Sequence, residues 1–330
     1  MFNNKIIFIT GGTGSFGQKF IEVVSTLYKP KKLIVYSRDE YKQFLMQKKF
    51  NPKKYPFLRF LLGDVRDLER LKIAMRGADY VVHAAALKHV PGAEYNPMEF
   101  VKTNVLGSEN IIQACLDSDV KRVVALSTDK AAAPINLYGA TKLCSDKLFV
   151  SANNIVGKSN TRFSVVRYGN VFASRGSVYN IFKLYKNKGF FPITDTKMTR
   201  FNITLNEATN MVLKVIKSAE GGEIYVPKLR SFRIIDLAKA INPKNKIKIL
   251  GIRAGEKIHE QMISSSDSYS TVELDNFYAI LPQGNLDLIK KYKKKNKSRM
   301  VKPGFEYSSD QNGPFLSLNE LKKLLRKHNK

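Results

Sequence analysis

A tyrosine and a lysine four residues apart are the first side chains in this sequence that could do chemistry together. Tyr138 and Lys142 occur in the segment YGATK, and a helix there would place both on one face. A free tyrosine is a poor base at neutral pH, and lowering its pKa from about 10 to about 7 requires roughly 4 kcal/mol. One ammonium at about 4 Å supplies a free energy of that order at an effective dielectric constant of about 20. We therefore predict that Tyr138 and Lys142 form a proton acceptor beside a hydride acceptor.

Four polar residues precede this pair at the end of a predicted strand. Ser127 and Thr128 close an apolar run, and Asp129 and Lys130 follow them directly. Open parallel sheets bind their ligands at the carboxyl ends of the strands. We therefore predict that hydroxyl, carboxyl and amino groups gather beside Tyr138 at one sheet edge.

A glycine-rich turn near the N-terminus predicts a dinucleotide site. The segment GGTGSFG satisfies both G-x-G-x-x-G and G-x-x-G-x-x-G, and it follows an apolar strand and opens a helix. Glycine lets the backbone approach a pyrophosphate, and the helix N-terminus favours the anion. The residues of this turn predicted to hold the cofactor are Gly11, Thr13, Gly14, Ser15, Phe16 and Gly17.

The end of the second predicted strand distinguishes NADP from NAD. Arg38 stands where an NAD site would have a carboxylate for the ribose 2′-hydroxyl, and Lys42 lies one turn further on. A guanidinium and an ammonium suit a 2′-phosphate, so NADP is the predicted cofactor, with NAD as the alternative that Asp39 leaves open. Asp64, at the end of the third strand, can accept a hydrogen bond from the adenine amino group. The other predicted cofactor contacts are Ser37, Glu40, Val65, Ala84, Lys88, Tyr138, Lys142 and Val171.

Short apolar runs alternate with helical patterns through the first half of the chain. The predicted helices include Asp67–Arg76, Met98–Leu116 and Tyr138–Asn153. The predicted strands are Lys5–Thr10, Lys32–Ser37, Leu58–Asp64, Tyr80–Ala86, Lys121–Thr128 and Arg162–Gly169. This alternation is typical of βαβ units, and the nearly continuous apolar runs predict a sheet covered on both faces. We predict an α/β fold, a Rossmann-like doubly wound parallel sheet, with residues 1–170 as an NADP-binding domain.

The rhythm changes after Asn170, which predicts a smaller C-terminal α/β substrate-binding lobe in residues 171–330, from which some chain can return to the first domain. The Lys290–Lys302 run of basic residues is expected to be a solvated loop. Shorter strands are predicted at Glu223–Val226 and Lys246–Leu250. The predicted helices are Ser177–Asn187, Asn206–Ser218, Ile234–Ala240, Glu256–Ile263 and Leu316–Arg326.

Composition narrows the class of protein. The 330 residues are 43% hydrophobic, which excludes a disordered chain. The net charge of +28 suits nucleic acid, a membrane surface or an anionic substrate. Tyr292 is the lone aromatic residue in the basic run, so there is no stacking platform for nucleic acid, and no apolar run reaches the roughly 18–20 residues of a membrane span. We expect neither partner.

Cysteine and histidine usage points to a cytoplasmic protein without a metal. Cys115 and Cys144 cannot build a disulfide framework, and both are expected to be buried free thiols. The four histidines lack metal-ligand spacing with cysteine. The N-terminal apolar run is too short for a signal peptide.

The motifs together resemble the extended short-chain dehydrogenase/reductase superfamily, which acts mainly on nucleotide sugars. Within it the chain is similar to the family of inverting UDP-N-acetylglucosamine 4,6-dehydratases, which begin the bacterial pseudaminic acid pathway. The resemblance runs from Asn4 to about Ser309. It rests on STDKA and PINLYGATK together with IVYSRDE, GDVRD, HAAALKHVP, EYNP, KTN, VVRYGNV, SRGSV, PITD, MTRF and GIRAGEKIHE.

This resemblance implies a reaction and a role for each catalytic residue. Tyr138 would be the base at sugar carbon 4, and the ketone formed there would acidify the hydrogen on carbon 5. Lys130 would remove that hydrogen and Asp129 would protonate the leaving hydroxyl on carbon 6, while Thr128 and Lys142 complete the catalytic set. Lys130 must be partly neutral to act, which burial or the neighbouring Lys142 would achieve. Retaining relatives carry an Asp-Glu pair at this place, so Asp-Lys indicates inversion.

The resemblance also implies substrate contacts and a homo-oligomer. Arginine forks suit the pyrophosphate of a UDP-sugar. Asn202, after MTRF, and the segments Phe172-Ala173 and Tyr179-Asn180 depart from the family pattern, which leaves the tolerance for other UDP-sugars open. The residues implied to bind substrate are Lys88, Asn170, Arg175, Gly176, Ser177, Val178, Thr194, Arg200, Arg253 and Glu256.

Three alternatives remain. Dehydratases that also epimerise toward N-acetyl-fucosamine-type sugars share several motifs but lack the tyrosine of YGATK, so Tyr138 argues against them. A UDP-sugar epimerase needs only tyrosine, lysine and a hydroxyl residue, and Asp129-Lys130 exceeds that need. An NADP-sensing or nucleic-acid-binding protein would have lost the catalytic residues, and they are present. The configuration at carbon 5 rests on Lys130 and the resemblance, and the sequence leaves the oligomeric state undetermined.

Overall fold

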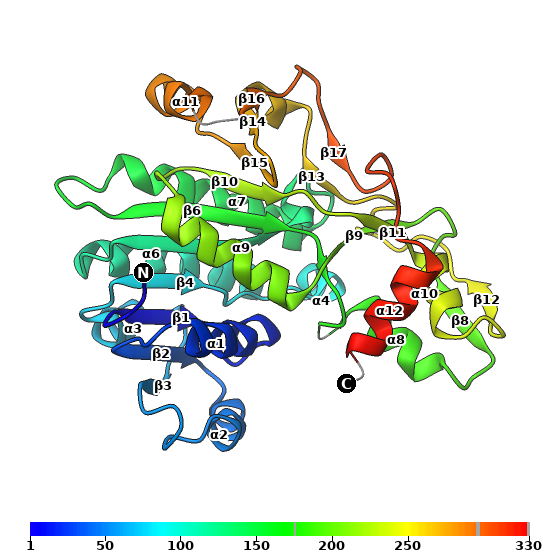
Figure 1. Ribbon diagram of the computed structural model, residues 1–330, viewed down its shortest axis with the longest axis horizontal. Coiled ribbons are helices and arrows are strands. Elements are labelled where there is room, and N and C mark those ends of the chain that lie inside the picture. Colours follow the sequence, from blue (N-terminus) through cyan, green and yellow to red (C-terminus); the bar gives the residue numbers. More distant parts are fainter. Residues whose placement is uncertain (175, 295–297, 329–330) are drawn as a thin grey trace.

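The computed structural model describes residues 1–174, 176–294 and 298–328, and Figure 1 shows a large sheet with a smaller lobe beside it. The sheet has ten strands in the order β16-β14-β15-β10-β6-β5-β4-β1-β2-β3. From β3 through β10 neighbouring strands are parallel, and β15, β14 and β16 extend the sheet with antiparallel pairs. The predicted α/β fold with a large parallel sheet is confirmed.

The six strands predicted in the first half all form, within a few residues of their expected ends. Their ends follow the switch from apolar runs to glycine or polar residues, as in Ser127-Thr128. The strands of the sheet are β1 (Ile6–Thr10), β2 (Lys32–Ser37), β3 (Leu58–Leu62), β4 (Tyr80–His83), β5 (Arg122–Thr128), β6 (Arg162–Tyr168), β10 (Ile224–Pro227), β14 (Thr271–Glu273), β15 (Phe277–Ile280) and β16 (Arg299–Met300).

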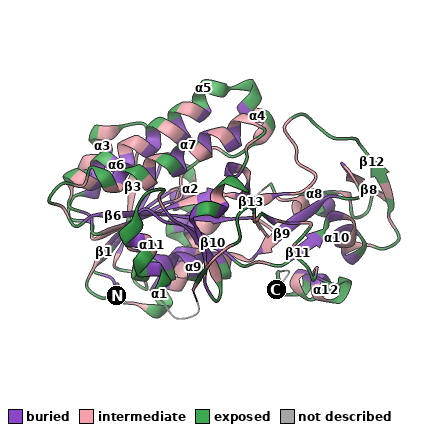
Figure 2. Ribbon diagram, turned by 90° about the horizontal axis from the view of Figure 1, so that it is seen from above, coloured by how far each residue is buried: buried purple, intermediate pink, exposed green. Residues whose placement is uncertain are grey.

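Helices cover both faces of the sheet, which explains why its strands are apolar on both sides. Figure 2 shows α3 (Leu68–Met75), α6 (Gly107–Asp117) and α7 (Leu137–Ser151) on one face and α1 (Ser15–Leu27) and α9 (Leu205–Ser218) on the other. The core accordingly has two layers: Ile7, Ile9 and Val35 pack under α1, while Phe8 and Val81 pack in the other layer. The outer strand pair carries α2 (Glu40–Lys49).

The helix predicted over Met98–Leu116 is interrupted. It consists of α5 (Pro97–Phe100), a π-helical segment η1 (Val101–Leu106) and α6, preceded by α4 (Val90–Tyr95). Single π-helical turns occur mostly inside α-helices and at functional sites. Here the π-helical segment turns Thr103 and Asn104 into the protein interior.

The smaller lobe is built from short elements around its own apolar core of Phe182, Phe191 and Leu237. The predicted helices 177–187, 206–218, 234–240 and 316–326 all form, but the strand predicted at 223–226 is β10 and joins the large sheet. The elements of the lobe are β7 (Asn170–Val171), α8 (Val178–Tyr185), β8 (Phe190–Ile193), β9 (Thr199–Ile203), β11 (Ser231–Arg233), α10 (Ile234–Ile241), β12 (Lys246–Ile249) and α12 (Leu318–His328).

The helix predicted at Glu256–Ile263 is wrong. The chain from 251 to 260 has no regular helix, and Gln261–Ile263 form β13, which pairs with β17 (Tyr307–Ser308). Gly255 takes a φ of +74°, which a right-handed helix does not allow. The charged side chains of this segment bond across to the turn that follows β5, as described below.

Two smaller expectations are also corrected. Cys115 is buried, but Cys144 lies on the exposed face of α7. The first half of the Lys290–Lys302 run is helical rather than a loop, because α11 (Leu286–Lys293) buries Leu288 and Tyr292 and only its lysines face water; residues 295–297 of this run lie outside the described residues. Among the helices that the structure describes, none is long and apolar enough to cross a membrane.

Tyr292 docks α11 onto the sheet and provides a test of this correction. Its hydroxyl donates to Glu223 Oε1 at 2.8 Å and also contacts the hydroxyl of Tyr225, and all three residues are buried. We expect Tyr292→Phe to lower the free energy of unfolding by about 1–3 kcal/mol, because a buried carboxylate loses a donor. Urea unfolding measures this change. Tyr41→Phe, at an exposed position, is the control, and equal stability of the two variants would show that α11 is not held in this way.

Candidate active site

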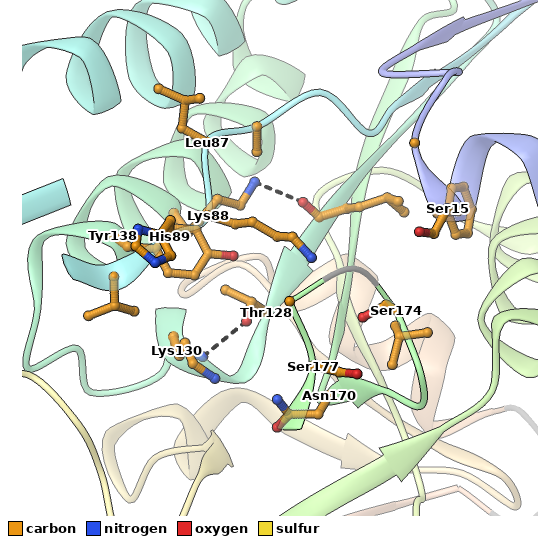
Figure 3. Close-up of a pocket in the computed structure, with 18 of the residues that line it drawn as sticks. Ser15, Leu87, Lys88, His89, Thr128, Lys130, Tyr138, Asn170, Ser174 and Ser177 are labelled. Carbon is orange, nitrogen blue, oxygen red and sulfur yellow. Dashed lines mark hydrogen bonds between the residues drawn. The ribbon is translucent and has the colours of Figure 1, made fainter. Parts of the chain in front are cut away.

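The carboxyl ends of the parallel strands open into a cavity of about 870 Å³ between the large sheet and the smaller lobe. Its lining comes from the loops after β1, β2, β3, β4, β5 and β6 and from the segments around α8, β9 and residues 253–260. Figure 3 shows Tyr138, Thr128 and Lys130 on one side of this cavity, with Ser15 across from them and Asn170, Ser174 and Ser177 nearby.

The cavity brings most of the predicted site residues together. Glu40 does not line it, and Arg175 lies outside the described residues. The predicted residues that line it are Gly11, Thr13, Gly14, Ser15, Phe16, Gly17, Ser37, Arg38, Asp39, Lys42, Asp64, Val65, Ala84, Lys88, Thr128, Asp129, Lys130, Tyr138, Lys142, Asn170, Val171, Gly176, Ser177, Val178, Thr194, Arg200, Arg253 and Glu256.

The glycine turn after β1 fits a dinucleotide pyrophosphate. Gly11 has a φ of +63°, and a Cβ on it would lie 2.7 Å from the backbone nitrogen of Ala85. A Cβ on Gly17 would lie 2.4 Å from Gly12 Cα, so α1 starts tight against the strand. The N-cap residue Gly14 offers no side-chain hydrogen bond to the helix. The first N–H groups of α1 therefore face the cavity without a side-chain cap, which is the arrangement that binds phosphate.

The cations expected at the 2′-phosphate are paired with carboxylates. Arg38, whose side chain is 54% exposed, lies 3.6 Å from Asp64, and Lys42 forms an ion pair with Asp39. Asp39 is also the N-cap of α2 and accepts a hydrogen bond from the Lys42 backbone nitrogen at 2.9 Å. Asp64 is held by Arg66 at 2.8 Å. These exposed pairs are weak, so a bound phosphate can replace the carboxylates.

Tyr138 and Lys142 are both buried at the start of α7. Asn136 caps the helix by accepting from Gly139 N at 2.8 Å, and Lys142 Nζ donates to the carbonyl oxygen of Leu126 at 2.8 Å. Burial raises the pKa of Tyr138 to about 12, against the lowering effects of Lys130 and of a hydrogen bond with Thr128. Burial lowers the pKa of Lys142. The protein groups alone therefore do not make Tyr138 a base at neutral pH.

Asp129 and Lys130 form a 3₁₀ turn, η2 (Asp129–Ala131), directly after β5. Lys130 Nζ lies 3.1 Å from Asp129 Oδ1, and Thr128 Oγ1 donates to the same oxygen at 2.9 Å. Burial would lower the pKa of Lys130, but the carboxylates of Asp129 and Glu260 outweigh it and the pKa is raised. The expectation that burial or Lys142 makes Lys130 partly neutral is therefore not met by this arrangement.

Glu260 was missed by the sequence analysis and completes this charged group. Its Oε1 lies 2.9 Å from Lys130 Nζ, and the residue is 2% exposed. Glu260 ends the motif GIRAGEKIHE, from which only Arg253 and Glu256 were assigned a role. Lys257, in the same segment, donates to the carbonyl oxygen of Ala132 at 2.8 Å. The segment that was expected to be a helix therefore fastens the smaller lobe to the turn after β5.

Asn104 is a second residue that the sequence analysis passed over, although its motif KTN was noted. Its side-chain amide accepts from Leu87 N and donates to Leu87 O, each at 2.9 Å, and donates to Thr141 Oγ1 at 3.0 Å. The π-helical turn makes this possible because it points Asn104 inward. The loop that carries Lys88 is thereby held against the helix that carries Tyr138.

The predicted substrate contacts separate into two kinds. Asn170 Oδ1 and Ser177 Oγ are buried and have no hydrogen-bond partner among the described residues, so both are available to a ligand in the cavity. Arg200 instead donates to the carbonyl oxygens of Thr199, Ile258 and Lys257. Its guanidinium is used to hold the 253–260 segment. Arg253 and Glu256 form an ion pair at 3.0 Å, and Thr194 Oγ1 donates to Glu256 at 3.3 Å. Among the described residues no group of His, Cys, Asp and Glu could hold a metal ion.

A parallel sheet with a glycine turn at its first strand, a Tyr-Lys pair on the helix after β5 and a second lobe over the cavity defines an extended short-chain dehydrogenase/reductase. Residues 7–282 match the model of the polysaccharide biosynthesis protein family, and the chain belongs to this family.

The similar proteins act on nucleotide sugars. The inverting UDP-N-acetylglucosamine 4,6-dehydratase of Campylobacter jejuni is 54% identical, with 98% of each chain covered. A UDP-glucose 4-epimerase of Rickettsia akari is 40% identical, covering 98% of this chain and 96% of its own. The X-ray structure of Pen from Bacillus thuringiensis is 38% identical with a TM-score of 0.90, covering 100% of this chain and 99% of its own.

Gly11→Ala tests the proposed pyrophosphate turn. We expect at least a tenfold loss of dinucleotide affinity in calorimetric titration, because the new Cβ would push the turn away from Ala85. Gly157→Ala is the matched control, since Gly157 has a similar φ of +57° and open space around it. The control should lose stability of about 1 kcal/mol and keep its affinity. Equal affinities in the two variants would contradict this assignment.

Proposed function

We propose that this protein is an inverting UDP-N-acetylglucosamine 4,6-dehydratase, a hydro-lyase that makes a UDP-4-keto-6-deoxy-L-arabino-hexosamine for pseudaminic acid biosynthesis. The observation that carries the proposal is the placement of Asp129 and Lys130 in one cavity with Tyr138. The 54% identity to a dehydratase of this specificity supports it. NMR of the product made from UDP-N-acetylglucosamine tests it: a 4-keto sugar with a methyl group at carbon 6 and inverted carbon 5 is expected, and recovery of a 4-epimer would overturn it.

Three side chains carry the proton transfers. Tyr138 takes the proton of the carbon 4 hydroxyl. Lys130, in its neutral form, takes the hydrogen on carbon 5 as a proton, and Asp129 gives its proton to the carbon 6 hydroxyl, which leaves as water. A bound nicotinamide dinucleotide supplies the hydride acceptor and returns the hydride to carbon 6. Since the raised pKa of Lys130 leaves it protonated at rest, its proton must first move to a neighbouring group.

We also propose the finer features of this enzyme. Residues 1–170 form the NADP-binding domain, and residues 171–330 supply most of the substrate-binding lobe. Asn170 and Ser177 bind the sugar nucleotide through the buried oxygens that lack a partner. The enzyme works in the cytoplasm as a homo-oligomer, and neither nucleic acid nor membrane is its partner.

The second candidate function is a UDP-sugar 4-epimerase. The Rickettsia relative of that name, 40% identical over nearly the whole chain, is the observation that favours it. An epimerase has no use for an acid and a base at carbons 5 and 6. The buried Asp129–Lys130–Glu260 group therefore favours dehydration.

Arg38→Ala tests NADP as the cofactor. We expect the affinity for NADP to fall more than tenfold and that for NAD to change little, because only the 2′-phosphate needs the guanidinium. Calorimetric titration with both dinucleotides measures the ratio. Lys48→Ala on the same side of α2 removes one charge outside the cavity and controls for the general loss of positive charge. An equal loss for both dinucleotides would show that Arg38 does not recognise the 2′-phosphate.

Lys130→Ala tests the division of the reaction into two halves. Tyr138 and Lys142 remain, so the cofactor should still be reduced, with its absorbance rising transiently. No base would stand over carbon 5, so the product rate should fall about 10²–10⁴-fold, and deuterium from deuterium oxide should not enter carbon 5. Tyr138→Phe is the contrasting variant, because it should stop cofactor reduction as well. Deuterated product at a near wild-type rate in Lys130→Ala would assign the base to another residue.

A further inference from the structure

Glu260 is a buried carboxylate that lines the cavity without an assigned role in the reaction. It lies just before β13, yet its Oε1 is 2.9 Å from Lys130 Nζ and 3.6 Å from Arg200 Nε. Its Oε2 is buried and has no hydrogen-bond partner among the described residues. A carboxylate removed from water in this way needs compensating charge, and Lys130 and Arg200 provide it.

Asp129 approaches the same ammonium from the other side. Its Oδ1 is 3.1 Å from Lys130 Nζ, the residue is 1% exposed, and its Oδ2 is also buried without a partner among the described residues. Two buried carboxylates therefore share one lysine. Like charges that share a site push their pKa values apart, so one of the two carboxylates takes a proton more readily.

The surrounding charges decide which carboxylate that is. Burial raises the pKa of Glu260, but Lys130 and Arg200 outweigh it and the pKa is lowered. Burial raises the pKa of Asp129, Glu260 raises it further, and Lys130 does not fully offset them. The other ionisable groups that face this cluster are Lys257, whose ammonium acts on both carboxylates, and Tyr138.

We infer that Glu260 is a positioning residue that determines how many protons the Asp129–Lys130 pair carries at neutral pH, an inference that rests on the proposed function. The reaction needs one proton on the pair, held by Asp129 while Lys130 is neutral. That form arises when an N–H bond of Lys130 breaks and an O–H bond of Asp129 forms along their 3.1 Å contact, with no proton exchanged with water. The fixed negative charge of Glu260 opposes loss of this proton from the pair as the pH rises.

The pH dependence of carbon 5 exchange tests the inference. The probe is the 4-keto product of the wild-type reaction in deuterium oxide, because its carbon 5 hydrogen is already acidic and the step at Tyr138 is bypassed. The exchange rate should rise as the doubly protonated pair loses one proton and fall as the last proton leaves. In Glu260→Gln a negative charge is gone, so both apparent pKa values should fall. Both limbs should therefore move to lower pH by about one unit or more.

Two control variants separate charge from packing. Glu260→Asp keeps the charge, so its limbs should lie close to those of the wild type even if its rate is lower. Glu223→Gln removes another fully buried carboxylate, one that bonds Ser164 and Tyr292 away from the cavity, and should lower stability without moving the limbs. A merely structural role of Glu260 would lower the rate at every pH and leave the limbs in place, which would overturn the inference. A shift in Glu260→Asp as large as in Glu260→Gln would overturn it too.

The wild-type profile provides a test that does not depend on the variants folding. The raised pKa of Lys130 places the descending limb above about pH 9, and a descending limb below pH 8 would overturn the inference. Formation of the 4-keto product with limbs unmoved in Glu260→Gln overturns this inference alone. Failure of the wild type to make any 4-keto product overturns the proposed function, and the inference with it.

Discussion

The ion pair between Lys130 and Glu260 is the contact on which the site depends. Lys130 follows β5 of the large sheet, and Glu260 precedes β13, far along the chain. Around this pair Lys257 bonds the carbonyl oxygen of Ala132, and Asn136 bonds that of Gly255 at 2.7 Å. Loss of one partner of a buried ion pair leaves an unpaired charge and costs about 3–5 kcal/mol. The contact that holds the smaller lobe over the strand ends is therefore also the one that sets the charge of the catalytic turn.

Burial and charge act against each other at every ionisable group in this cavity. Tyr138 has its pKa raised to about 12 by burial, although Lys130 and Thr128 lower it. For Lys130 the balance goes the other way, because two carboxylates outweigh burial. The same low-dielectric surroundings thus hold a phenol neutral and an ammonium charged. A positively charged ligand beside Tyr138 would be felt strongly here for the same reason.

The positive charge of the chain is largely committed to carboxylates inside the cavity. Lys42 pairs with Asp39, Arg38 lies near Asp64, and Arg253 pairs with Glu256. Such exposed pairs contribute little, about 0–1 kcal/mol each, so phosphates can replace the carboxylates at small cost. Arg200 differs because it is buried and bonded to three carbonyl oxygens. It is better suited to hold the 253–260 segment than to exchange partners.

The features that were predictable from the sequence are those contained in one contiguous segment. The glycine turn, the alternation of strands with helices and the spacing of Tyr138 and Lys142 follow from local backbone geometry, so the fold and most of the cavity lining could be expected. The inward turn of Asn104, the contacts of Arg200, the partnership of Glu260 with Lys130 and the direction of each pKa could not. Each depends on burial and on contacts between residues distant in the chain, and only the tertiary structure brings those residues within a few ångströms of one another.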